Sequence, residues 1–416
     1  MKMKRKLLAT SICLCSTASY AESNLQFHVD GFLTAGFGVL SAEQVFTQQI
    51  DSASLPTLIS FGLPPQYDTV LVRPEIYNYN SKMDFQQPAI AGINGRVSFL
   101  DNYSAAMQIT GLGSNEFDAQ IEWAYLEYRV NKAWDFRLGR LRLPLYMFSD
   151  TLEVGYSYPW VTPPGEIYSL VPFSNYAGAE VVYDNQVFDH SLRASLFYGS
   201  LAGTNVTHTL ATNITLKQLL GGYLTYGDPD LQMRLGYAEA NISINPAPAF
   251  VPIIDAYAEI YGAPDVISDY DYQSVKAYFM NAGLEINKND WLFLGEIVEQ
   301  SANSVSVNKT RAWYATLGYK FCSDWTPFVS YAQQITLNKA ARVYDGPLGV
   351  AINPIVSALN NDQKTWTVGL RWDVIDKTDI KLQVDHIEAE NGTAGLFNVD
   401  PQHEIYLVRG TVDLIF

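Results

Sequence analysis

The chain has 416 residues, of which 48% are hydrophobic, 13% aromatic and 17% charged, and this composition excludes a disordered or fibrous protein. The 43 acidic residues outnumber the 27 basic ones and give a formal charge of -16, which argues against a general role in nucleic-acid binding. We therefore expect a large folded protein that has no nucleic-acid partner.

The first residues have the features of a secretory signal peptide. A basic stretch at 2–6 precedes an apolar stretch at 7–19, and Ser19 and Ala21 are small residues at the two positions that a signal peptidase reads. We predict cleavage after Ala21, so residues 1–21 form the signal peptide and residues 22–416 form a single mature domain. Cys322 is then the one cysteine left, which excludes a disulfide within the mature chain.

The mature chain has the period of two that is typical of β-strands. In the first segment Leu25, Phe27 and Val29 share one face, and Gln26 and His28 share the other. No stretch of about 18 apolar residues follows the signal, so no membrane-spanning helix is predicted. The alternation predicts an all-β fold of sixteen strands, at about 25–37, 88–100, 103–112, 117–130, 134–144, 176–183, 190–199, 217–226, 231–240, 274–286, 291–300, 309–320, 325–333, 364–373, 379–387 and 406–416.

The connections between these strands alternate between short and long. The short ones lie at 101–102, 131–133, 184–189, 227–230, 287–290, 321–324 and 374–378. Aromatic residues such as Trp134, Trp291 and Trp325 sit where the short turns meet the strands. Short turns on one side, long loops on the other and aromatic girdles are typical of a transmembrane antiparallel β-barrel, which must close on itself because lipid cannot satisfy an unpaired strand edge.

The chain resembles the sixteen-stranded trimeric porins of Gram-negative outer membranes. The resemblance lies in LEYRV (126–130), RLGRLRLPL (137–145), SDTLEVGYSYPWVTPPGEIY (149–168), VGLRWDV (368–374) and the terminal Phe416. It implies a homotrimer of water-filled barrels, surrounded by outer-membrane lipid and lipopolysaccharide, through which small hydrophilic solutes and ions diffuse passively. It also implies that the third external loop, here about 146–175, folds into the channel and narrows it.

Strand phase suggests which charged residues form this constriction. An arginine facing the bilayer midplane costs about 2–4 kcal/mol, so we expect a bulge near Gly139 that turns Arg140 and Arg142 inward and leaves Leu141 and Leu143 facing lipid. A similar slip in the preceding strand turns Glu127 and Arg129 inward. The predicted basic wall contains Arg96, Arg129, Arg137, Arg140 and Arg142, and the predicted acidic residues on the loop opposite are Asp150, Glu153 and Glu166.

Other interpretations of these residues remain open. The arginines can instead pair with Glu122, Glu127 and Asp135 and only hold the loop against the wall. The loop aromatics Tyr156, Tyr158 and Trp160 can stack on sugars or pack against the barrel. Seven further cations alternate with acids on the predicted inner face and are expected to be paired or solvated: Arg193, Arg234, Lys276, Lys320, Arg371, Lys381 and Arg409.

The sequence gives little support to an enzyme. The five histidines form no metal-spaced pair, and there is no Gly-x-Ser-x-Gly motif. We expect no catalytic residue, metal or cofactor. Two alternatives to a diffusion porin remain: a solute-selective channel with the same barrel, and a surface adhesin or receptor whose working parts are the long loops near 40–87, 241–273 and 334–363.

Overall fold

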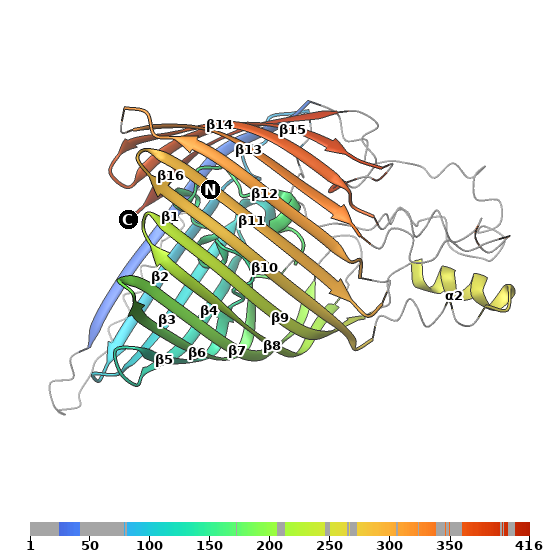
Figure 1. Ribbon diagram of the computed structural model, residues 1–416, viewed down its shortest axis with the longest axis horizontal. Coiled ribbons are helices and arrows are strands. Elements are labelled where there is room, and N and C mark those ends of the chain that lie inside the picture. Colours follow the sequence, from blue (N-terminus) through green and yellow to red (C-terminus); the bar gives the residue numbers. More distant parts are fainter. Residues whose placement is uncertain are drawn as a thin grey trace, which may run out of the picture.

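The computed structural model describes most of the chain (Figure 1). The described residues are 25–41, 79, 81–171, 173–205, 213–245, 250–263, 266, 273–304, 307–322, 324–337, 346, 349, 360–391, 393, 395–397 and 404–416. The predicted signal peptide at 1–21, and most of the long loops at 40–87 and 334–363, lie outside them. None of the helices in the described part is long and apolar enough to cross a membrane.

Sixteen antiparallel strands form a closed barrel in which each strand pairs with its neighbours in sequence, and β1 pairs with β16 (Figure 1). The predicted fold class is therefore confirmed. The strands are β1 (Gln26–Leu40), β2 (Ile90–Phe99), β3 (Tyr103–Leu112), β4 (Ala119–Arg129), β5 (Trp134–Arg142), β6 (Asn175–Val187), β7 (His190–Asn205), β8 (Asn213–Asp228), β9 (Leu231–Asn245), β10 (Val275–Lys288), β11 (Trp291–Ala302), β12 (Thr310–Tyr319), β13 (Trp325–Thr336), β14 (Gln363–Ile375), β15 (Thr378–Ala389) and β16 (Ile405–Ile415).

The outer surface of the barrel is apolar and carries exposed aromatic side chains next to the short turns. Trp134 lies 4.8 Å from Tyr183, and Trp325 stacks on Trp372 with ring centroids 4.7 Å apart. These aromatic pairs are cross-strand partners, so each holds two neighbouring strands in register. Val368 of β14 and Leu382 of β15 also face outward and are exposed.

The terminal residue closes the seam between β1 and β16. The backbones of Gly31 and Phe416 exchange two hydrogen bonds of 3.0 Å, and the Phe416 ring occupies the space that a side chain at position 31 would need. Glycine at position 31 therefore permits the last residue to lie flat on β1.

Deleting Phe416 should lower the yield of folded barrel. The deletion removes both seam hydrogen bonds, a loss of roughly 1–3 kcal/mol at the usual value per bond. The fraction of refolded protein that migrates as the compact form on unheated gels measures this loss. Phe416→Leu keeps the backbone pairs and is the control; equal yields for the deletion and wild type would contradict the prediction.

The prediction of a bulge in β5 is wrong, whereas the bulge predicted in the preceding strand, β4, is present. Gly139 pairs in register with Tyr125 on one side and Gly178 on the other, without a shift. Its φ of +144° instead allows close approach to β4, where a Cβ would lie 2.5 Å from a carbonyl oxygen. In β4 the register with β3 slips so that Glu122 is the extra residue.

The connection between β5 and β6, residues 143–174, packs by an apolar face on the inside of the barrel. It contains the 3₁₀ turns η3 (Ser149–Thr151) and η4 (Gly155–Ser157) and the short helix α1 (Gly165–Tyr168). The apolar cluster joins this connection to inward residues of β7, β8 and β10–β13; its members include Leu141, Leu143, Leu145, Tyr146, Trp160, Ile167, Phe197, Leu216, Phe279, Leu294, Val298, Tyr314 and Phe328. Leu141 and Leu143 thus belong to this inner cluster, and the prediction that they face lipid is wrong.

The other two helical elements lie in connections between strands. A short turn, η2 (Gly113–Asn115), joins β3 to β4, and α2 (Phe250–Ile260) lies beyond the strands in the connection between β9 and β10 (Figure 1). Both belong to the side of the barrel that carries the long connections.

Candidate functional site

Polar contacts fix the start of the 143–174 connection to the barrel wall. Arg234 of β9 donates to the Pro144 carbonyl at 2.7 Å. Glu296 of β11 accepts from the Met147 amide at 2.9 Å and from the Tyr168 hydroxyl at 3.0 Å. Because Glu296 is almost fully buried, these bonds replace the water that its carboxylate loses.

Side chains of β14, β15 and β16 bind the middle of the connection through its backbone. Arg371 donates to the carbonyls of Tyr156 and Tyr158 at 2.8 and 3.2 Å, and the Val161 amide donates to Gln383 at 2.8 Å. Two further contacts join Lys381 to the Gly155 carbonyl and Arg409 to the Thr162 hydroxyl. The connection is therefore attached on the side of the barrel opposite the strand from which it departs.

Three of the predicted wall arginines share a buried carboxylate. Glu127 of β4 lies 3.0 Å from Arg96, 3.0 Å from Arg137 and 3.9 Å from Arg129. Arg137 also reaches Glu180 of β6 at 3.2 Å. The wall is thus a network of ion pairs, as the alternative interpretation proposed, and it brings together Arg96, Arg129 and Arg137.

In this network, Arg96 and Arg129 are more accessible to water than the carboxylate of Glu127. The side chains of Arg96 and Arg129 are 39% and 57% exposed, whereas that of Glu127 is 6% exposed. Tyr125 lies beside them: its hydroxyl accepts from Arg96 at 3.3 Å, and its ring lies 5.5 Å from the Arg137 guanidinium. The inner wall at β2, β4 and β5 therefore presents guanidinium groups to the interior and covers its carboxylates.

Arg142 and Glu153 do not face each other across an open gap, so the expectation of two opposed walls is wrong for this pair. Arg142 forms a bidentate ion pair with Glu153, and its Nη1 lies 3.5 Å from Glu122. Ser174 also donates to Glu122 at 2.8 Å. These residues hold the connection against the end of β5, because a buried arginine requires carboxylate partners.

Arg140, Asp150 and Glu166 are also placed differently from the prediction. Arg140 is exposed in the outward row of β5 and donates to the Glu122 carbonyl at 3.4 Å. It lies near the loop end of the strand, where a cation costs about 0–1 kcal/mol rather than the midplane value, so no bulge is needed. Asp150 is exposed on the connection, and Glu166 is buried against β14.

The loop aromatics pack against the wall instead of offering a stacking surface. Tyr158 and Trp160 are 3% and 1% exposed. Trp160 contacts the Tyr314 ring edge-on at 5.3 Å and donates to the Thr316 hydroxyl at 3.2 Å. Tyr156 is partly exposed and lies 4.7 Å from the Arg371 guanidinium.

A second ionic cluster, on β14, β15 and β16, contains two of the cations that the sequence predicts to be paired or solvated on the inner face, Arg371 and Lys381. Lys381 is 1% exposed and lies 3.1 Å from Asp413 and 3.7 Å from Asp379. Arg371 lies 3.0 Å from Asp379. The period-two alternation of these charges placed them on the inner face, but the pairing depends on strand register, which the sequence does not give.

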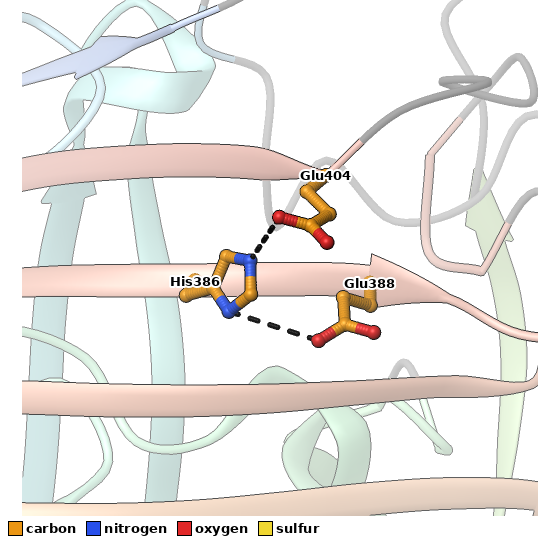
Figure 2. Close-up of side chains that lie close together, drawn as sticks. All are labelled: His386, Glu388 and Glu404. Atoms are coloured by element: carbon orange, nitrogen blue, oxygen red, sulfur yellow. Dashed lines mark hydrogen bonds and ion pairs between the residues drawn. The ribbon is translucent and has the colours of Figure 1, made fainter.

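A group of metal-capable side chains lies on the outer surface of β15 and next to the start of β16 (Figure 2). The His386 ring stacks on Tyr406, and its two nitrogens lie 3.1 Å from Glu404 and 3.7 Å from Glu388. Glu388 also lies 2.8 Å from Lys364. Each ring nitrogen already faces a carboxylate, so the group forms a set of polar contacts at the rim, outside the inner wall.

No protein-family model and no curated protein matches the chain. Solved structures do. Salmonella typhi OmpF in complex with daunomycin matches with a TM-score of 0.56 at 11% identity, over 94% of this chain and 97% of that one. The outer membrane channel DcaP of Acinetobacter baumannii matches with a TM-score of 0.55 at 10% identity, over the same shares. An anion-selective porin from Comamonas acidovorans matches with a TM-score of 0.54 at 10% identity, over 94% of this chain and 100% of that one.

At these identities the likeness concerns the fold. The structural neighbours are outer-membrane porins, and the barrel of this chain is closed by sixteen strands. The resemblance inferred from the sequence is therefore confirmed for the architecture.

Proposed function

We propose that the protein is an outer-membrane porin that forms a water-filled channel for passive diffusion of small hydrophilic solutes and ions. The observation that carries this proposal is that the barrel combines an apolar outer surface with an inner wall on which Arg96 and Arg129 are accessible to water. A barrel buried in lipid needs the first feature, and an aqueous path needs the second.

The path runs along the inner faces of β1–β5 in this proposal, because the apolar cluster fills the side formed by β7, β8 and β10–β13. The 143–174 connection bounds the path on its other side and acts as the constriction. Guanidinium groups that cover their carboxylates favour anions over cations near the wall. One of the structural neighbours is described as anion-selective, which fits this preference.

A solute-selective channel is the second candidate, and the anchoring of the connection favours it. Contacts to β9, β11, β12, β14, β15 and β16 fix the connection at many points. A rigid constriction discriminates between solutes more sharply than a mobile one, because less ordering is needed when a solute binds.

Single-channel recording of the purified protein in planar bilayers, under a salt gradient, tests the proposal. Ohmic conductance with a reversal potential that indicates anion preference is the expected result. Saturation of the current by one solute and not by others would favour the selective channel. Absence of any conductance from correctly folded protein would contradict both and would leave a surface adhesin or receptor as the interpretation.

The proposal includes export through a cleaved signal peptide at 1–21 and assembly into a homotrimer in the outer membrane, surrounded by lipid and lipopolysaccharide. One structural neighbour, OmpT of Vibrio cholerae, is described in a trimer form. The mass of the native protein in mild detergent measures the oligomeric state, and N-terminal sequencing of the mature protein locates the cleavage site.

A further inference from the structure

Glu166 of α1 is a fully buried carboxyl group that the proposed channel does not use. Its Oε1 accepts hydrogen bonds from Gln363 Nε2 at 2.7 Å and from the Thr365 hydroxyl, both on β14. Its Oε2 has no hydrogen-bond partner among the described residues. These contacts attach α1 to the barrel wall through one side chain, and both donors are neutral.

A small cavity adjoins this carboxyl group. It has about 10 Å³ of space for the centre of a water molecule, which corresponds to roughly one water. Its polar lining comes from Thr162, Glu166, Thr365, Thr367, Gln383, Asp385 and Arg409. The free oxygen of Glu166 thus has room for a proton and for one water that links it to neighbouring polar groups.

The charges around Glu166 do not compensate an ionised carboxylate. β14 presents the neutral side chains of Gln363 and Thr365, and β13 presents Ala332. β15 presents Asp385 and β16 presents Arg409, and these two form an ion pair of 2.6 Å that leaves little net charge. Burial raises the pKa of the Glu166 carboxyl, and the hydrogen bonds from β14 offset this only in part.

We propose that Glu166 is a proton-binding latch, which holds α1 on β14 as a neutral carboxylic acid and weakens that attachment when its proton passes to water. Attachment of α1 is then strongest below the ordinary pKa of a glutamic acid, about 4.3, and is lost as pH rises from there through the raised pKa of the docked group. Acid therefore tightens the 143–174 connection and narrows the path beside it. The proposal rests on the docked connection and not on the channel activity.

Hydrogen exchange on the full-length protein in detergent tests the latch without any current. The Tyr168 and Ser169 amides donate to the Pro164 and Gly165 carbonyls, so their exchange reports whether α1 is intact. We expect their protection factors, corrected for the intrinsic effect of pH, to fall at least tenfold between pH 4 and pH 8. In Glu166→Gln, which stays neutral, they should remain at the acid value of wild type throughout.

Two further variants show whether the transition belongs to Glu166. Glu116→Gln removes an exposed carboxylate on the connection between β3 and β4 and should keep the wild-type profile. Thr365→Val removes a donor to the ionised carboxylate and should move the transition to higher pH, and it serves as well if Glu166→Gln fails to fold. A transition that is unchanged in both Glu166→Gln and Thr365→Val would overturn the proposal.

Two other results would also overturn it. One is constant protection in the wild-type protein from pH 4 to pH 8. The other is protection that depends on replacing NaCl by choline chloride at constant pH and ionic strength, which would identify a bound cation in the cavity. Loss of conductance with an intact exchange profile would instead contradict the channel proposal and leave the latch standing.

Discussion

Replacing Lys381 by Met is expected to destabilise the barrel by about 3–5 kcal/mol, the usual cost of removing one partner from a buried ion pair. Lys381 is 1% exposed and lies between Asp379 and Asp413, two carboxylates that are themselves 0% and 1% exposed. The substitution removes the cation that lies between these two carboxylates, leaves Asp379 with Arg371 as its cation, and removes the contact with the Gly155 carbonyl. Denaturant unfolding of the refolded protein measures the change.

Lys364→Met is the matched control for this prediction. Lys364 is also on the C-terminal strands and also contacts two carboxylates, Glu388 and Glu390, but it lies partly exposed on the outer rim. Its loss should cost no more than about 1 kcal/mol. Adding Asp379→Asn and Asp413→Asn to the Lys381 variant should recover part of the stability. Equal costs for the two lysines would refute the assignment of a buried ionic cluster.

Replacing Arg96 and Arg137 together by Ala should shift the ion preference of the channel strongly toward cations and raise its conductance. The double variant removes two of the cations that contact Glu127, and only Arg129, at 3.9 Å, remains beside that carboxylate. The field near the wall then reverses its sign. The shift in reversal potential should be severalfold larger at 0.1 M than at 1 M salt, because the screening length falls from about 10 Å to about 3 Å.

Arg311→Ala provides the comparison for the double arginine variant. Arg311 is paired with Glu299 at 2.6 Å on the outward row of β12, so it is outside the proposed path. Its replacement should leave conductance and reversal potential unchanged, and Glu127→Gln should shift the preference toward anions. If Arg311→Ala changed the reversal potential as much as the double variant did, the β2, β4 and β5 wall would not line the path.

The sequence predicts the barrel well because apolar and polar residues alternate within each strand. Alternation places Trp134, Phe136 and Leu138 outward, and the short turns at 227–230 and 287–290 coincide with the observed ends of the hairpins. The phase of a strand is less well predicted where a bulge occurs. Both β4 and β5 contain conflicting patterns, and only the register with β3 shows that Glu122 is the extra residue.

The candidate site is predicted less well, because its contacts join residues that are distant in sequence. The apolar side chains of Leu141 and Leu143 are equally compatible with a lipid-facing position and with an apolar cluster inside the barrel. They lie in the inner cluster because the 143–174 connection packs against them. Glu166 is an ordinary acidic residue in the sequence; its burial follows from contact with Thr365, 199 positions later. The sharing of Glu127 by three arginines likewise depends on cross-strand register.

The seam between β1 and β16 also constrains the order in which the molecule is made. Thr34 bonds to Asp413, which lies 379 positions later, and neither strand has its second neighbour until the whole chain has been synthesised. In a nascent chain that lacks β16, one edge of β1 has unpaired backbone N–H and C=O groups, which can hydrogen-bond to strands of other chains. Contacts of such long range form slowly. The barrel therefore cannot close until translation has reached its last strand, and every earlier stage of synthesis leaves the sheet open at β1.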